Sequence, residues 1–316
     1  MLYDLIIIGG GPAGVTAGIY AARKKLKTLL ITKEWGGQIT KAKEIYNWPG
    51  TKVISGMELI KQMTDQLKTF GIEIKENREV IDLDKKGDNF IVRDNDQEYE
   101  AKAVIIATGK IPRALNIPGE AQFRGKGVSF CATCDAPLFK NKTVAVIGGG
   151  NAGFALAVDL VDYAKKIYIL EFFEEMKGDL VTKEKLEKTG KVEFIVNAAV
   201  KEIKGSKPAP YRAEGSGSGF VESLIYEDMK TSKDHEIKVD GVFIAVGMMA
   251  KAEFAAKLVE LNQIGEIVID KDNYTKTPGV FVAGDISDIK YEQLVIACGE
   301  GAKAALAATD YLKNKQ

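Results

Sequence analysis

The order of apolar and polar positions is the same in two separate parts of the chain. Near the start, an apolar run over residues 3–8 leads into a glycine-rich turn over residues 9–14. A helix-like segment over residues 15–25 and a second apolar run over residues 28–31 follow. This order predicts a strand, a tight turn, a helix and a second strand, which together form a βαβ unit.

The same order returns in the middle of the chain. An apolar run over residues 143–147 leads into a glycine-rich turn over residues 148–153. A helix-like segment over residues 154–163 and an apolar run over residues 167–170 complete the second βαβ unit. We therefore interpret the chain as containing an internal repeat.

Each βαβ unit is followed, at a similar distance, by a further apolar strand that ends in a glycine. Residues 101–106 lead into an Ala-Thr-Gly turn, and residues 235–244 lead into an Ala-Val-Gly turn. The repeat thus predicts two duplicated nucleotide-binding domains of the doubly wound type.

The last part of the chain has no glycine turn of its own. It contains a helix-like segment over residues 292–312, and we expect it to complete the first domain. The expected fold is α/β, with two Rossmann-like, three-layer ββα domains and the second inserted in the first. The first domain would then comprise residues 1–114 and 250–316, and the second domain residues 115–249.

Both glycine turns have the spacing G-x-G-x-x-G between a strand and a helix. In such a turn the first glycine permits the bend, the second lets the backbone approach a pyrophosphate, and the third lets helix and strand pack closely. A glycine-rich turn without a ligand is the alternative, but the context of both turns favours dinucleotide binding. The candidate binding residues are Gly9, Gly11, Pro12, Ala13 and Gly14 in the first turn, and Gly148, Gly150, Asn151, Ala152 and Gly153 in the second.

An acidic residue about 20 positions after such a turn usually accepts a hydrogen bond from the ribose hydroxyls. In the second domain this residue is Glu171, followed by Phe-Phe-Glu-Glu over residues 172–175. No Arg or His stands there to meet a 2′-phosphate, so we expect NADH to be preferred over NADPH. A solvated acidic turn is the alternative interpretation of this segment.

The composition narrows the possible partners. Lys and Arg equal Asp and Glu at 44 each, which gives no electrostatic attraction to nucleic acid or to an anionic membrane. No apolar run approaches the roughly 20 residues that a membrane helix needs. The first predicted strand begins almost at Met1, which leaves no room for a cleaved signal peptide. We therefore expect a cytoplasmic protein without nucleic-acid or membrane partners.

Two of the three cysteines, Cys131 and Cys134, form a Cys-x-x-Cys pair. Structural zinc needs four ligands, and only the isolated Cys298 and His235 remain, so we expect no metal site. In a reducing compartment such a pair is more typical of redox chemistry than of a structural crosslink. Asp135 directly follows the pair and is the candidate proton donor, with a surface turn residue as the alternative.

Two nucleotide sites and a dithiol suggest an electron path from nicotinamide to a flavin and then to the disulfide. The nicotinamide site and the dithiol fall in one domain, yet both have to reach one flavin. We therefore predict that the second domain rotates on its two linkers between turnovers.

Taken together, these motifs resemble the low-molecular-weight thioredoxin reductase family over essentially the whole chain. The matching segments are residues 9–14, 36–38, 47–50, 107–109, 131–135, 148–153 and 284–285. The resemblance implies a homodimer that holds FAD in its first domain, binds NAD(P)H in its second and reduces a thioredoxin- or glutaredoxin-like protein. It implies that Cys134 faces the flavin, that Cys131 attacks the partner, and that Asp285 contacts the ribityl region. The other flavin-site residues it implies are Gly37, Gln38, Asn47, Ala107, Thr108, Gly109, Gly284 and Gln293.

The nucleotide site departs from the NADPH-using members of that family. They have a His-Arg-Arg-like run where this chain has Glu-Phe-Phe over residues 171–173. That segment, with residues 176–179 and 289–293, is closer to the flavoprotein subunit of alkyl hydroperoxide reductase. That subunit uses NADH and has an additional N-terminal thioredoxin-like domain. This chain starts directly at the FAD strand, so we expect its electron acceptor to be a separate protein.

Other functions stay open. An NADH oxidase, or a reductase of a separate peroxidase partner, would pass electrons to oxygen or to a peroxiredoxin system. A non-enzymatic redox sensor would keep a flavin that NADH does not reduce. The Gly-, Ser- and Pro-rich segment over residues 205–219 is predicted to be a mobile loop, and Cys298 is predicted to be a small buried residue rather than a third redox thiol.

Overall fold

The computed structural model describes residues 1–42, 44–206 and 219–315, except for the side chains of residues 133 and 134. Almost all of the loop predicted over residues 205–219 therefore lies outside the described residues. Among the described residues, no helix has both the length and the apolar character that a bilayer crossing requires.

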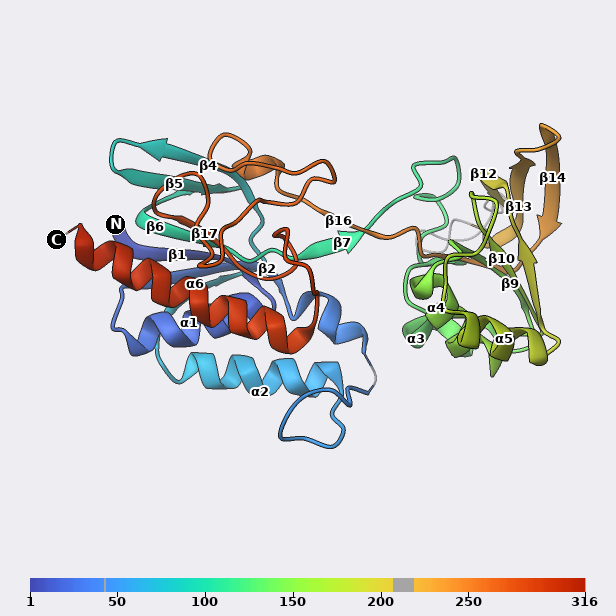
Figure 1. Cartoon of the computed structure of the whole chain (residues 1–316), viewed down its shortest axis with the longest axis horizontal. Helices are drawn as coiled ribbons and strands as arrows, with labels where there is room; N and C mark the ends of the chain where they lie inside the picture. The colour runs from blue at the N-terminus through green and yellow to red at the C-terminus, as the bar shows by residue number, and fades with distance from the viewer. Residues whose placement is uncertain (43, 207–218, 316) are drawn as a thin grey trace, which may run out of the picture. The chain divides into compact units, whose positions relative to one another are not determined.

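The chain divides into two compact units, whose elements are labelled in Figure 1. Unit 1 comprises Met1–Ile111 and Met249–Gln316, and unit 2 comprises Pro112–Met248. Unit 2 is thus an insertion between two parts of unit 1. Two short strands, β7 (Lys110–Pro112) and β16 (Met248–Ala250), pair with each other where the chain passes between the units.

Unit 1 is built on a parallel sheet in the order β3-β2-β1-β6, to which β17 is added beside the end of β6. The start of β6 pairs instead with β5, and β5 forms an antiparallel hairpin with β4. The bounds are β1 Leu2–Gly10, β2 Thr28–Trp35, β3 Glu73–Glu76, β4 Val80–Lys86, β5 Asn89–Asp94, β6 Glu98–Ile106 and β17 Val280–Val282.

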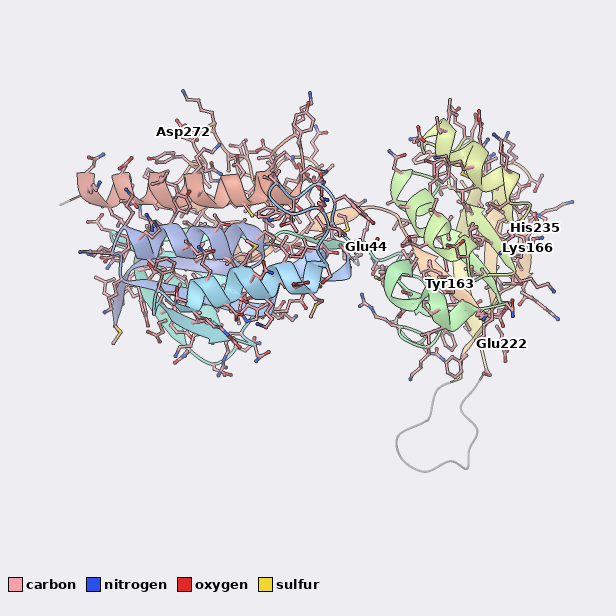
Figure 2. The ribbon with its side chains drawn as sticks, turned by 90° about the horizontal axis from the view of Figure 1, so that it is seen from below. Glu44, Tyr163, Lys166, Glu222, His235 and Asp272 are labelled. Atoms are coloured by element: carbon pink, nitrogen blue, oxygen red, sulfur yellow. The ribbon has the colours of Figure 1, made fainter. Side chains whose placement is uncertain are left out.

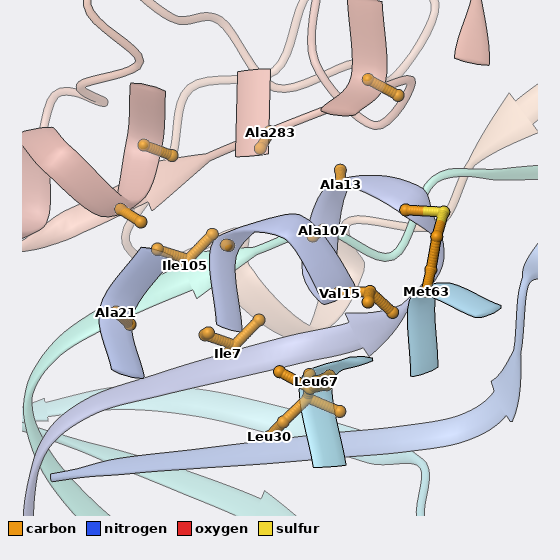
Figure 3. Packing of buried hydrophobic residues seen from close by; sticks show 14 of the residues in the cluster. Ile7, Ala13, Val15, Ala21, Leu30, Met63, Leu67, Ile105, Ala107 and Ala283 are labelled. Carbon is orange, nitrogen blue, oxygen red and sulfur yellow. The ribbon is translucent and has the colours of Figure 1, made fainter. Parts of the chain in front are cut away.

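Both faces of this sheet are buried, which explains why its strands are almost uninterrupted apolar runs. Because alternate residues point to opposite faces, Ile7 and Leu30 belong to the core under the helices (Figure 3), whereas Ile6 and Ile31 belong to the core on the hairpin side. Unit 1 therefore has three layers. Its helices are α1 (Pro12–Arg23), α2 (Gly56–Lys68) and α6 (Leu294–Asn314).

Helix α6 lies beside α1 (Figure 1), and small residues of α6 are buried where the two helices meet. A Cβ atom on Gly301 would lie 2.1 Å from the carbonyl oxygen of Ala13, so only glycine permits this approach. Ala304, Ala305 and Ala308 continue the buried face of α6. The last helix of the chain thus returns to the first glycine turn.

Unit 2 has the same plan. Its parallel sheet has the order β11-β10-β9-β15-β8, with helices on one face and a three-stranded antiparallel sheet, β12-β13-β14, on the other. The two Rossmann-like domains of an α/β fold are confirmed. The bounds are β8 Val128–Ser129, α3 Ala132–Asp135, β9 Thr143–Ile147, α4 Asn151–Val161, β10 Lys166–Leu170, α5 Leu180–Lys188, β11 Val192–Ile195, β12 Ala198–Gly205, β13 Val221–Asp228, β14 Lys233–Lys238 and β15 Gly241–Ile244.

The prediction of one strand over residues 235–244 is wrong. The first part forms β14 in the antiparallel sheet, and the second part forms β15 in the parallel sheet. The chain turns at Asp240, whose N–H donates to the Thr143 carbonyl and whose carboxylate accepts from the Thr143 N–H. His235 consequently lies on β14 and is exposed (Figure 2). Its ring stacks on Tyr226 with 5.3 Å between the centroids.

Candidate functional site

The first glycine turn lies between β1 and α1. The fold itself needs two of its glycines. Gly9 has a φ of +117°, and a Cβ atom there would lie 2.3 Å from the Ala107 carbonyl oxygen, while a Cβ on Gly14 would lie 1.9 Å from the Gly9 carbonyl oxygen. Gly11 differs, because its φ is −77° and a Cβ on it would meet no described atom within 4 Å. Open space beside Gly11 fits a ligand that approaches the backbone closely.

The second glycine turn, between β9 and α4, repeats this geometry. Gly148 has a φ of +111°, and a Cβ on it would lie 2.4 Å from the Ala245 carbonyl oxygen. A Cβ on Gly153 would lie 1.8 Å from the Gly148 carbonyl oxygen, whereas a Cβ on Gly150 would again meet nothing within 4 Å among the described residues. In each turn, the second glycine of the G-x-G-x-x-G pattern, Gly11 or Gly150, is therefore the one whose presence packing does not explain.

Both helices that follow these turns begin without a side-chain cap. Their N-cap residues are Gly11 and Gly150, neither of which offers a side-chain oxygen. The N–H groups of a first helical turn have no acceptor within the helix, and a bound phosphate supplies one. Both turns therefore fit the pyrophosphate of a dinucleotide.

Asp285 lies next to the first glycine turn. It follows Gly284, which has a φ of +77° and on which a Cβ would lie 3.1 Å from the Ala13 Cβ. The Asp285 Oδ1 atom is buried and has no hydrogen-bond partner among the described residues. Burial raises the pKa of Asp285, the charge of Glu292 raises it further, and Lys110 opposes both. A buried acceptor without a partner is costly, and the hydroxyls of a ribityl chain would satisfy it, so this site fits FAD.

Other residues expected at the flavin site are connected by hydrogen bonds. Gln38 Nε2 donates to the Lys110 carbonyl oxygen at 3.1 Å. Asn47 Nδ2 donates to Gln293 Oε1 at 3.2 Å, and Gln293 is the N-cap residue of α6. These bonds connect residues 38–47 to Lys110 and to the start of α6, which are far apart in the sequence. Gly37 has a φ of +52°, and a Cβ on it would meet no described atom within 4 Å.

Glu171 directly follows β10 and is buried. Its Oε2 accepts the N–H of Gly149 at 2.6 Å, and its Oε1 accepts the N–H of Phe173 at 3.1 Å. The carboxylate is therefore fixed at the second glycine turn, and a carboxylate has acceptor capacity beyond two bonds for ribose hydroxyls.

A lysine at the same turn was not predicted from the sequence, where only an Arg or a His was expected to meet a 2′-phosphate. The N–H of Lys177 donates to the Gly149 carbonyl oxygen at 3.0 Å. Its Nζ lies 3.9 Å from the centroid of the Phe173 ring. Lys177 follows Glu171 by only six residues, and this short spacing could have indicated that the lysine lies near the same turn.

Cys131 is half-buried and in a disulfide. The N–H of Asp135 donates to the Cys131 carbonyl oxygen at 3.2 Å, so these two residues lie one helical turn apart. Ser129 Oγ accepts the Cys131 N–H at 3.0 Å and holds the start of the turn. Cys134, the predicted partner, has its side chain outside the described part of the chain.

The third cysteine, Cys298, is a free thiol in α6 and lies half-buried against the first glycine turn. Its Sγ lies 4.0 Å from the Pro12 carbonyl oxygen, and burial raises the pKa of the thiol. A raised pKa leaves less of the reactive thiolate, which favours a packing role. In the part of the chain that the structure describes, no group of three or more His, Cys, Asp or Glu side chains could hold a metal ion.

An ion-pair cluster around the buried Lys110 was not predicted from the sequence. Lys110 Nζ lies 2.5 Å from Glu266 Oε1 and 2.5 Å from Glu292 Oε1. Its partners are 156 and 182 positions away in the sequence, so no local pattern indicates the cluster.

Comparison with known proteins identifies the family. The family model described as pyridine nucleotide-disulphide oxidoreductase matches residues 3–304. An alkyl hydroperoxide reductase subunit of Staphylococcus aureus is 39% identical over 311 residues, which are 98% of this chain and 59% of that protein. An NADH dehydrogenase of Bacillus subtilis is 37% identical over 310 residues, which are 98% of this chain and 58% of that protein. The chain thus spans less than two thirds of the length of these curated relatives.

Two solved structures are similar to this chain over almost its whole length. Lactococcus lactis thioredoxin reductase is 34% identical, with a TM-score of 0.86 and 99% of each chain covered. T. acidophilum thioredoxin reductase is 35% identical, with a TM-score of 0.82 and 98% of each chain covered. The resemblance to thioredoxin reductases is confirmed. Since the family model covers almost the whole chain, the chain belongs to the pyridine nucleotide-disulphide oxidoreductase family.

Proposed function

We propose that this protein uses NADH to reduce the disulfide of a separate thioredoxin- or glutaredoxin-like protein. The observation that supports this most directly is that unit 2 holds both a disulfide-bonded cysteine and an open glycine turn. Cys131 is in a disulfide one helical turn from Asp135, and Glu171 is fixed at the turn around Gly149.

We assign FAD to unit 1 and the nicotinamide dinucleotide to unit 2. FAD, when bound, accepts two electrons from the reduced nicotinamide and passes them to the disulfide. The partnerless Oδ1 of Asp285 and the open space beside Gly11, both judged among the described residues, support the assignment to unit 1. The residues that would hold FAD are Gly9, Gly11, Pro12, Ala13, Gly14, Gly37, Gln38, Asn47, Ala107, Thr108, Gly109, Gly284, Asp285 and Gln293. Those that would hold NADH are Gly148, Gly150, Asn151, Ala152, Gly153 and Glu171.

Once reduced, the cysteine pair would exchange with the protein substrate. The Cys131 thiolate attacks one sulfur of the substrate disulfide and forms a mixed disulfide, and the second substrate sulfur leaves as a thiolate. The Cys134 thiolate then attacks the Cys131 sulfur, so the substrate leaves as a dithiol and the disulfide of the pair forms again. Asp135 donates a proton to a leaving thiolate. The net reaction converts NADH, a proton and a disulfide into NAD⁺ and a dithiol.

The preference for NADH rests on Glu171. Its carboxylate lies at the second glycine turn, where it would accept hydrogen bonds from ribose hydroxyls and repel a 2′-phosphate. Lys177 is the opposing feature, because a basic side chain near this turn would attract that phosphate.

A second acceptor is favoured by a different observation. The two curated relatives described above are a hydroperoxide reductase subunit and an NADH dehydrogenase. The alternative function is therefore transfer of electrons to a separate peroxiredoxin-type peroxidase, or to oxygen.

These functions are separated by testing one preparation against several acceptors. The FAD-loaded protein and NADH would be mixed with a thioredoxin, a glutaredoxin, a two-cysteine peroxiredoxin and oxygen. We expect the thioredoxin or glutaredoxin disulfide to be reduced fastest. Cys131→Ser and Cys134→Ser should lose this activity by about 100-fold or more, whereas the matched variant Cys298→Ser should retain it. Reduction of the peroxiredoxin alone would favour the second acceptor. The proposal would be contradicted if the wild type reduced no protein disulfide and if Cys131→Ser and Cys134→Ser consumed oxygen as fast as the wild type.

A further inference from the structure

Lys110 lies where several segments of unit 1 meet. It follows Gly109 directly and is the first residue of the linker strand β7. Its side chain is only 8% exposed, and its Nζ lies 2.5 Å from an oxygen of Glu266 and 2.5 Å from an oxygen of Glu292. One buried cation thus binds two carboxylates from different loops.

The two glutamates stand on the segments next to Asp285. Glu266 immediately precedes Ile267, whose N–H donates at 3.0 Å to the carbonyl oxygen of the residue after Asp285. Glu292 immediately precedes Gln293, the N-cap residue of α6. The ion pairs of Lys110 therefore hold both ends of the loop that connects Asp285 to α6.

The backbone of Lys110 is held as well. Its carbonyl oxygen accepts a hydrogen bond from Gln38, and Asn47 donates to Gln293 beside the Lys110 partner Glu292. Gln38 is thus connected to Lys110 directly, and Asn47 and Gln293 are connected to it through Glu292. We assign all three residues to the flavin site.

The charges of the neighbouring carboxylates also indicate a role for Lys110. Without Lys110, the buried Glu266 and the partly exposed Glu292 would leave uncompensated negative charge beside Asp285, in a region that also has to accept an anionic dinucleotide. Although burial opposes it, the contact with Lys110 holds the pKa of Glu266 below its ordinary value. Removing the cation from a buried ion pair strands its partner charges, which is strongly unfavourable.

We propose that Lys110 is a positioning residue of the flavin site, which holds the Asp285 and Gln293 segments in place and balances their negative charge. This inference rests on the assignment of FAD to unit 1. It makes the affinity for FAD depend on the first residue of a linker strand, which no local sequence pattern indicates.

The test is the dissociation constant of FAD from the FAD-free protein, measured by quenching of flavin fluorescence. At about pH 8 we expect Lys110→Met to raise this constant about tenfold or more, and Lys110→Arg to restore most of the affinity. Lys61→Met is the matched control, since Lys61 forms an exposed pair with Asp65 on α2, and it should leave the constant unchanged.

A pH profile separates charge balance from packing. The charged groups that face Lys110 are Glu266 and Glu292 in contact and Asp285 through its charge. A carboxylate stranded in a buried place, as Glu266 would be in Lys110→Met, acquires a raised pKa, so it becomes neutral as the pH falls. The loss in Lys110→Met should therefore be smaller at about pH 5.5 than at about pH 8. An equal loss at both pH values would overturn the charge role.

The outcomes distinguish this inference from the function on which it rests. Wild-type binding of FAD together with equal binding by Lys110→Met at both pH values would overturn the role of Lys110 alone. Failure of the wild type to bind FAD would overturn both. Circular dichroism would show whether Lys110→Met folds. If it does not, the double variant Lys110→Met/Glu266→Gln strands one carboxylate fewer. It should still bind FAD more weakly than the wild type, because neither loop is then held by an ion pair, and equal affinity at about pH 8 would overturn the positioning role.

Discussion

At the scale of single residues, Glu171 and Lys177 lie at the same turn and favour different nucleotides. The Glu171 carboxylate is fixed 2.6 Å from the Gly149 nitrogen, in the place where ribose hydroxyls are usually bound. The Lys177 ammonium group lies over the Phe173 ring, and it would lose this cation–π contact if it moved to a 2′-phosphate. We therefore expect Glu171 to decide the preference.

Glu171→Ala should lower kcat/KM for NADH by about tenfold or more and should reduce the preference for NADH over NADPH. Steady-state kinetics with both nucleotides would measure this. Lys177→Met is the matched variant at the same turn, and it should leave the NADH value unchanged while lowering the NADPH value. A wild type that is more efficient with NADPH would contradict the preference.

Asp285 predicts a conflict between stability and FAD binding. Burial raises its pKa, so the folded chain holds this proton more tightly than the unfolded chain does. The stability contribution of such a group is present at low pH and is lost as the pH rises from the unfolded towards the folded pKa. Without FAD, Asp285→Asn should therefore unfold at a higher temperature than the wild type at neutral pH. The difference should shrink as the pH falls towards about 4.

Calorimetry of the FAD-free proteins, together with FAD titration, would measure both effects. The affinity of Asp285→Asn for FAD should fall, because an amide no longer presents two acceptor oxygens. An Asp285→Asn variant that is less stable than the wild type without FAD at neutral pH would contradict this account of the site.

At the scale of elements, the two glycine turns separate folding from binding. A Cβ on Gly14 or Gly153 would collide with a backbone carbonyl oxygen, whereas a Cβ on Gly11 or Gly150 would enter open space. Gly11→Ala should therefore keep the unfolding temperature of the FAD-free protein but weaken FAD binding about tenfold or more. Gly150→Ala should retain FAD and raise the KM for NADH instead.

Gly14→Ala is the comparison variant, and it should lower the unfolding temperature or prevent folding, because its clash lies within the fold. FAD titration and thermal unfolding of the three variants would measure these effects. Unchanged FAD affinity in Gly11→Ala would mean that the open space beside the first turn is not used by the ligand.

The sequence predicted these elements because their signals are local. A strand, a glycine turn and a helix follow one another within about 25 residues in each unit, so spacing alone indicates them. The division of residues 235–244 into β14 and β15 was not predictable in this way, because it depends on the bonds of Asp240 to Thr143. The Lys110 cluster escaped for the same reason, since its partners come from distant segments.

At the scale of the whole molecule, the chain consists of two units with the same strand–turn–helix plan, and the second is inserted in the first. The duplication separates the assigned FAD residues of unit 1 from the nicotinamide residues and dithiol of unit 2. The homodimer and the rotation of one unit on its linkers remain predictions, which light scattering and distance measurements in solution would test.

Anaerobic titration with NADH tests the central claim most directly, because it counts the electrons that one chain accepts. The wild type and Cys134→Ser would be compared, with the visible absorbance of the flavin as the signal. The wild type should take up about two equivalents of NADH, one for FAD and one for the disulfide, and Cys134→Ser about one. Equal uptake by the two proteins, or a flavin that NADH does not reduce, would contradict an electron path from nicotinamide to the Cys131–Cys134 pair.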